Sequence, residues 1–148
     1  MSEHRAEIEW RRDARPFGVR YDRSHSWRFD SGVVVAASSA PDLMGDPTRV
    51  DPEEAFVASI SSCHMLWFLY LAAEAGLVVD SYRDPAVGLM QRDEGGVTWI
   101  TDVTLRPEIT WSGDAPTDAT VASLHHDSHV RCFIANSVRT AITVELPV

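Results

Sequence analysis

The sequence has few cysteines and few basic residues, and it lacks internal repeats and low-complexity segments. Only two cysteines, Cys63 and Cys132, occur in 148 residues, which excludes the disulfide-dense class of small secreted domains. The 13 basic residues stand against 22 acidic ones, for a formal net charge of −9. This charge argues against binding of nucleic acid or of an anionic membrane through a basic surface.

Several functional motifs are also missing. There is no Gly-rich phosphate loop and no Ser nucleophile elbow, so we expect neither a nucleotide cofactor nor a serine hydrolase. The first ten residues, MSEHRAEIEW, contain no apolar core, and we therefore expect no signal peptide and a cytoplasmic location. In that compartment two cysteines more often carry chemistry or redox sensing than a permanent disulfide.

The longest apolar stretch predicts a helix from Asp51 to Gly76. Asp51 is a plausible N-cap, Pro52 suits the first helical position, and Glu54 stands three residues after Asp51 as in a capping box. Gly76 suits the position after the helix. Between these ends the residues are apolar nearly all round, which predicts a central helix buried on most sides.

A core role suits this helix better than a membrane-spanning one. Residues 55–73 are nearly long enough to cross a bilayer. Polar residues interrupt them, acids flank both ends, and no excess of arginine marks a cytoplasmic side. We therefore expect a core helix and no membrane partner.

The rest of the chain predicts strands in two runs and a second helix. A cap at Thr117 begins this helix, which should end near Arg131 with Val121, Leu124 and Ser128 on one face. The order predicts one α+β domain over residues 1–148, with antiparallel sheet packed on the central helix. The expected strands are Glu7–Arg11, Val19–Tyr21, Trp27–Phe29, Val33–Ala37, Leu77–Val79, Ala86–Met90, Val97–Leu105, Ile109–Trp111 and Thr140–Val148.

These features together resemble the OsmC/Ohr family of thiol-dependent peroxidases. The match lies in Asp-Pro-Glu-Glu at 51–54, in Ser62-Cys63 inside a long apolar helix, and in Cys132 followed by Asn136-Ser137 before a last strand. The order agrees over nearly the whole chain. The resemblance implies a small α+β fold, an intertwined homodimer and reduction of organic hydroperoxides. One position departs from it, because His64 stands where the family's peroxidases commonly have an apolar residue.

The implied nucleophile is the Cys63 thiolate. Burial in an apolar helix raises the pKa of a thiol, so a nearby cation is needed to restore reactivity. The resemblance implies an arginine from the N-terminal strands, held by the carboxylate of Glu53. Among Arg20, Arg23 and Arg28 we favour Arg23, with Arg20 second.

Glu53 and Cys63 are ten residues apart, or roughly 15 Å along a straight helix. They cannot then share one site. Either the helix breaks near residues 59–62, or Glu53 and its arginine come from the partner subunit of the homodimer.

The resemblance also implies a resolving thiol. A Cys63 sulfenic acid can condense with a second thiol, and Cys132 is the other cysteine of the chain. An external dithiol, which is lipoyl-bearing in some family members, would reduce the resulting disulfide. Neighbouring apolar residues favour an alkyl or fatty-acyl hydroperoxide over hydrogen peroxide: Phe56, Met65, Trp67 and Phe68.

Alternatives of other classes remain open. A non-catalytic protein of this fold would hold a lipophilic ligand beside Cys63, with His64 closing the site to peroxide; a redox sensor would share the thiol chemistry. His64 could act as a base or as a cation that replaces the arginine. The histidines at 125, 126 and 129 suggest a zinc site by spacing, but no Glu lies between His125 and His129 as in zincins, and we expect no metal.

Overall fold

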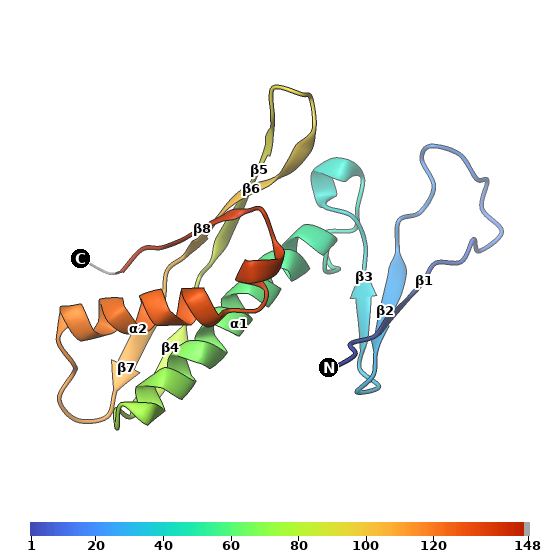
Figure 1. Cartoon of the computed structure of the whole chain (residues 1–148). Helices are drawn as coiled ribbons and strands as arrows, with labels where there is room; N and C mark the ends of the chain where they lie inside the picture. Colours follow the sequence, from blue (N-terminus) through green and yellow to red (C-terminus); the bar gives the residue numbers. More distant parts are fainter. Residues whose placement is uncertain (147–148) are drawn as a thin grey trace. The chain divides into compact units, whose positions relative to one another are not determined.

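The computed structural model describes residues 1–146, and the chain divides into two compact units, Met1–Ala55 and Phe56–Val148 (Figure 1). The first unit contains a three-stranded antiparallel sheet of β1 (Ala6–Glu9), β2 (His25–Phe29) and β3 (Val34–Ala37). The strands predicted at Trp27–Phe29 and Val33–Ala37 are thus confirmed, and they pair antiparallel as β2 and β3. A short 3-10 helix, η1 (Pro41–Leu43), lies between β3 and the start of the long helix. The single-domain assignment for residues 1–148 stays a prediction.

The strand predicted at Val19–Tyr21 is wrong. These residues belong to a turn in which the Tyr21 amide donates to the Gly18 carbonyl at 2.9 Å. The Arg23 guanidinium donates hydrogen bonds to the carbonyls of Val19 and Tyr21, at 2.9 and 2.6 Å. Because these carbonyls are bonded to a side chain within the loop, they do not join a ladder.

Helix α1 (Pro52–Glu74) confirms the helix predicted between Asp51 and Gly76, and it runs without a break. Its N-terminus carries a reciprocal capping box, in which the Glu54 amide donates to the Asp51 carboxylate at 2.7 Å and the Asp51 amide donates to the Glu54 carboxylate at 3.3 Å. Gly76 follows with a φ of +73°, a left-handed conformation that favours glycine and ends the helix. The alternative of a helix broken near residues 59–62 is therefore wrong.

The second unit contains α2 and two small sheets (Figure 1). Strands β4 (Val79–Arg83) and β7 (Glu108–Trp111) pair with each other. Helix α2 (Asp118–Arg131) is capped by the predicted Thr117, whose side chain accepts from the Thr120 amide, and it is followed by η2 (Ala135–Ser137). The other sheet has the order β5-β6-β8, with bounds Val87–Arg92, Thr98–Leu105 and Ala141–Val144.

The predicted α+β class is confirmed, with corrections in detail. Strand β8 pairs with β6 in parallel, not antiparallel. The predicted strand at Leu77–Val79 begins only at Val79. The end of the predicted last strand, residues 147–148, lies outside the described residues.

Both halves of α1 rest on sheet. Towards its N-terminus, Ile60 packs with Val103 and Leu105 of β6. Towards its C-terminus, Phe68 packs with Leu124 of α2 against partly buried side chains of β4 and β7. This packing fixes the position of Cys63, which lies between the two clusters along the helix.

The opposite side of α1 is not covered within the described residues. Leu66 and Tyr70 are 63% and 52% exposed, so the expectation of a helix buried on most sides is wrong for the chain on its own. By length and composition α1 could cross a membrane, but one such helix is weak evidence, because core helices of soluble proteins pass the same test.

Candidate functional site

The structure brings the two cysteines together. Cys63 lies on α1 and is half-buried, whereas Cys132 lies at the C-terminus of α2 and is 1% exposed; both are free thiols. Burial raises the pKa of Cys132 to about 11, and the neighbouring Cys63 side chain adds to the rise, while the Ala135 amide, which donates to Cys132 Sγ at 3.4 Å, opposes it. One thiol is thus accessible, and the other is buried and protonated at neutral pH.

Cys63 opens into an apolar pocket of about 380 Å³. This volume is within the range of small-molecule sites. The positions 63, 66, 67 and 70 follow a helical i, i+3, i+4, i+7 spacing, so their side chains share one face of α1. The pocket is lined by Cys63, Leu66, Trp67, Tyr70, Arg131 and Phe133.

Arg131 carries the positive charge in this pocket. Its guanidinium carbon lies 5.7 Å from the centre of the Trp67 ring, and Phe133 packs edge-on against the same ring at 5.6 Å. A hydrogen bond to Glu74 raises the pKa of Tyr70, and the charge of Arg131 opposes that rise. Arg131 therefore acts on the Trp67–Tyr70 end of the pocket.

His64 is buried and is absent from the lining of the pocket. It stacks on His125 of α2, with 5.3 Å between ring centres. Desolvation lowers the pKa of His64 to about 4, the charge of His129 adds to this, and Asp84 opposes it. Burial likewise lowers the pKa of His125 to about 4. Near neutral pH both rings are uncharged.

The histidine-rich helix α2 offers no assembled metal centre. Within residues 1–146, no group of three or more His, Cys, Asp or Glu side chains is placed to hold a metal ion. His125, the i, i+4 partner of His129 in the predicted spacing, contacts His64 instead.

The predicted arginines and Glu53 belong to the first unit. Arg23 stabilises its own loop. Its guanidinium donates hydrogen bonds to two loop carbonyls, and the guanidinium carbon lies 4.4 Å from the centre of the Tyr21 ring. Neither Arg20 nor Arg28 forms an ion pair with a described carboxylate, and Arg23 does not pair with Glu53 within residues 1–146.

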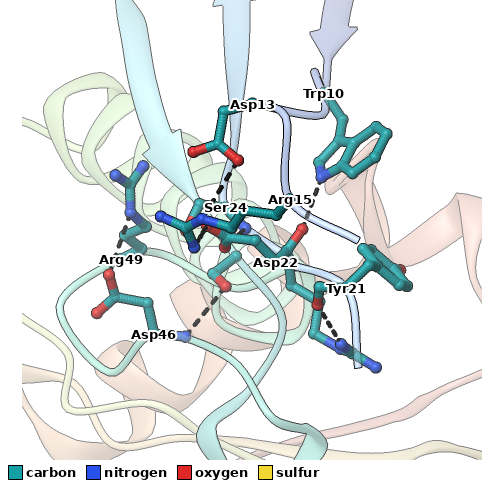
Figure 2. A network of polar contacts seen from close by, with 10 residues as sticks. Trp10, Asp13, Arg15, Tyr21, Asp22, Ser24, Asp46 and Arg49 are labelled. Atoms are coloured by element: carbon teal, nitrogen blue, oxygen red, sulfur yellow. Dashed lines mark hydrogen bonds and ion pairs between the residues drawn. The ribbon is translucent and has the colours of Figure 1, made fainter. Parts of the chain in front are cut away.

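The loop that carries Arg20 and Arg23 is held by a polar network (Figure 2). Trp10 Nε1 donates to the Asp22 carbonyl at 2.6 Å, and Arg15 pairs with the Asp22 carboxylate at 2.9 Å. The Ser24 amide lowers the pKa of Asp22, and the charge of Arg15 acts in the same direction. The loop therefore has a fixed internal structure.

Sequence reasoning missed Arg131 and the pairing of His64 with His125. A usable signal for Arg131 was its position directly before Cys132, since any fold that joins the two cysteines must bring residue 131 near Cys63. The pairing of His64 with His125 depends on the register of α1 against α2, and no local pattern encodes it.

Comparison with known proteins gives a consistent result. The family model described as OsmC-like protein matches residues 45–147. No curated protein matches the chain. An OsmC-like protein of unknown function from Vibrio cholerae is 44% identical, with a TM-score of 0.95 over 99% of this chain and 100% of that one.

More distant structures share the fold. The organic hydroperoxide resistance protein OsmC from Legionella pneumophila is 15% identical, with a TM-score of 0.74 over 99% of this chain and 96% of its own. The organic hydroperoxide resistance protein OhrB of Bacillus subtilis is 19% identical, with a TM-score of 0.73 over 99% and 98% of the two chains.

Proposed function

Because the chain belongs to the OsmC-like family, we propose that it is a cytoplasmic, thiol-dependent peroxidase that reduces organic hydroperoxides. The observation that carries this proposal is the contact between an accessible thiol, Cys63, and a buried thiol, Cys132, beside an apolar pocket. Structures of the same fold are named organic hydroperoxide resistance proteins, which supports the substrate class.

The reaction has three steps. The Cys63 thiolate attacks one peroxide oxygen, the O–O bond breaks, an alcohol leaves, and Cys63 becomes a sulfenic acid. The Cys132 sulfur then attacks Cys63, the disulfide forms and water leaves. An external dithiol, for which we propose a lipoyl type, returns both cysteines to thiols by exchange and is itself oxidised.

Burial of Cys132 suits the resolving step. A thiol with a pKa of about 11 is protonated at neutral pH and competes poorly with Cys63 for the peroxide. Its place against Cys63 makes the condensation intramolecular, which raises the effective concentration of the attacking sulfur.

Arg23, with Arg20 second, would stabilise the Cys63 thiolate, and Glu53 would orient the guanidinium. Since α1 is unbroken, Glu53 and Cys63 of one chain stay roughly 15 Å apart along the helix. We therefore assign the arginine and Glu53 to the partner protomer of a homodimer. The exposed apolar face of α1 around Leu66 and Tyr70 supports such an interface.

We assign His64 no direct part in this chemistry. Its side chain is 1% exposed and bonds to His125, and a pKa of about 4 makes it a poor base at neutral pH. We propose that His64 supports the packing of α1 on α2 beside Cys63.

A second function has support from the same pocket. Its apolar lining would also suit a non-catalytic protein that holds a lipophilic ligand. A thiol redox sensor would use the cysteines without turnover.

Consumption of cumene hydroperoxide with dihydrolipoamide tests the proposal. We expect turnover in the wild type, none in Cys63→Ser, and a single equivalent consumed before the reaction stalls in Cys132→Ser. If the wild type shows no turnover with any dithiol, the peroxidase proposal fails and the ligand-binding function takes its place.

A further inference from the structure

A pair of buried histidines joins the two helices that lead to the cysteines. His64 directly follows Cys63 on α1, and His125 lies seven residues before Cys132, two turns earlier on the same face of α2. The two histidines are 1% and 4% exposed. Their rings lie 7° from parallel, with Nε2 of His64 at 3.0 Å from Nδ1 of His125. One ring therefore donates a hydrogen bond to the other across the interface of the helices.

This contact is the only side-chain hydrogen bond between α1 and α2 in the described part of the chain. Ser128, the other buried polar residue of α2, donates its hydroxyl hydrogen to the Leu124 carbonyl of its own helix at 2.6 Å. The packing of Phe68 on Leu124 is apolar. Apolar packing has no preferred direction, whereas a hydrogen bond weakens steeply when its atoms shift. The histidine bond therefore fixes how α1 lies along α2.

The same pair carries a cost in stability. Nδ1 of His64 and Nε2 of His125 are buried without a hydrogen-bond partner among residues 1–146. A buried polar atom without a partner has a desolvation cost that an apolar side chain of similar shape avoids. Phe68 stacks on His125 with 4.3 Å between ring centres, so the surroundings would accept such a side chain. A contribution other than stability thus accounts for the two histidines.

We propose that the His64–His125 bond positions the two cysteines for their condensation, by holding α1 and α2 at the offset at which the sulfurs meet. This inference rests on the disulfide step of the proposed peroxidase cycle. In that step the Cys132 sulfur attacks the sulfur of the Cys63 sulfenic acid and the S–S bond forms. The S–O bond breaks, and the hydroxyl group leaves with the Cys132 proton as water. Disulfide geometry is specific, and a misplacement of about 1 Å can cost ~100-fold in rate.

Redox titration of the full-length protein with glutathione tests the proposal without requiring peroxide. Glutathione disulfide oxidises Cys63 and Cys132 to their disulfide and is itself reduced to two thiols, so the equilibrium gives the effective concentration of the two cysteines. Acid quenching, alkylation and mass spectrometry measure the oxidised fraction. His64→Phe keeps a ring that can stack on His125 but loses the hydrogen bond. We expect this variant to lower the effective concentration about tenfold or more.

Two amide variants separate the hydrogen bond from the size of the side chain. Gln carries its amide at about the reach of the imidazole Nε2, so His64→Gln should retain most of the effective concentration. His64→Asn has the same amide on a side chain one methylene shorter, and it should lose as much as His64→Phe. His125→Phe should have the same effect. Its combination with His64→Phe should add little, because both substitutions remove one bond.

Ser128→Ala is the matched control for a general loss of stability. It deletes another buried hydrogen bond of α2, one that stays within the helix. This variant should lower the melting temperature and leave the effective concentration of the cysteines unchanged. If His64→Phe, His64→Asn and His125→Phe behave in the same way as Ser128→Ala, the histidines only fill the core and the proposal is wrong.

Failure of the peroxidase function is seen separately. If the wild type consumes no cumene hydroperoxide but the effective concentration still depends on the histidine bond, the proposed function fails and the positioning role stands. If peroxide is consumed and the effective concentration is insensitive to the bond, the positioning role fails alone. If glutathione disulfide forms no Cys63–Cys132 disulfide in the wild type, the disulfide step and the positioning role both fail.

Discussion

Gly88 on β5 passes so close to α1 that a Cβ atom at this position would lie 2.5 Å from Cγ2 of Val57. Real Cβ atoms essentially never make such contacts, so the absence of a side chain allows the strand to pack against the helix. This close approach supports the core cluster towards the N-terminus of α1, where Ile60 packs on β6.

Gly88→Ala should therefore destabilise the protein by about 1–3 kcal/mol, the usual cost of overpacking. Urea unfolding monitored by circular dichroism measures the change. Gly18→Ala is the control, since a Cβ there meets nothing within 4 Å. The double variant Gly88→Ala with Val57→Ala should recover part of the loss; equal stability of Gly88→Ala and wild type would show that the strand shifts freely.

Acid should weaken the protein through the pair of His64 and His125. Nε2 of His64 lies 3.0 Å from Nδ1 of His125, and the other nitrogen of each ring is buried without a partner among residues 1–146. With pKa values near 4 in the folded state and about 6.5 when unfolded, the unfolded chain binds more protons between these values. Stability is thus present above pH 6.5 and is lost as the pH falls towards 4.

The free energy of unfolding should drop by about 2–4 kcal/mol from pH 7 to pH 5, as measured by urea titration at both values. In the double variant His64→Leu with His125→Leu, this loss of unfolding free energy on acidification should shrink markedly. His126→Gln changes an exposed histidine and should retain it. An unchanged drop in the double variant would assign the acid sensitivity to other groups.

The two cysteines should differ sharply in reactivity. Cys132 is 1% exposed, and its pKa is raised to about 11, so only a minute fraction is thiolate at pH 7.5. Iodoacetamide should modify Cys63 first, with Cys132→Ser labelled at nearly the wild-type rate and Cys63→Ser labelled at least tenfold more slowly. Mass spectrometry at successive times measures the labelling rate of each cysteine. Faster labelling of Cys132 than of Cys63 would contradict the proposed roles.

Mixed dimers test whether Arg23 acts across a subunit interface. Cys63→Ser and Arg23→Ala should each be inactive alone. After co-refolding in equal amounts, about half of the dimers contain one of each, and each of these holds one complete site if the arginine comes from the partner. Peroxide consumption should then return to about one quarter of the wild-type value, whereas no recovery would place Arg23 and Cys63 in the same chain's site.

Local sequence patterns were sufficient to predict where the two long helices begin and end. Asp51, Glu54, Gly76 and Thr117 act through bonds within a few residues, so the ends of α1 and α2 could be predicted. The predicted strand at Val19–Tyr21 is absent because the Arg23 side chain donates hydrogen bonds to two carbonyls of the loop. An alternating pattern of apolar and polar residues does not indicate such a contact.

The site could be predicted only in part, for a similar reason. The meeting of Cys63 with Cys132 followed from a family resemblance that spans both positions. The roles of Arg131 and His125 depend on how α1 and α2 lie against each other, and periodicity fixes which face of a helix is apolar without fixing its neighbour.

The parallel pairing of β8 with β6 has a consequence for the order of folding. Hairpin β5–β6 closes through nearby residues, but Asp102–Leu105 finds its second neighbour only in Ala141–Val144, after β7 and α2. During synthesis β6 thus keeps an unpaired edge until β8 has left the ribosome, and such edges invite aggregation. A nascent chain released before residue 144 would carry both cysteines and still lack the strand that completes the sheet beneath α1.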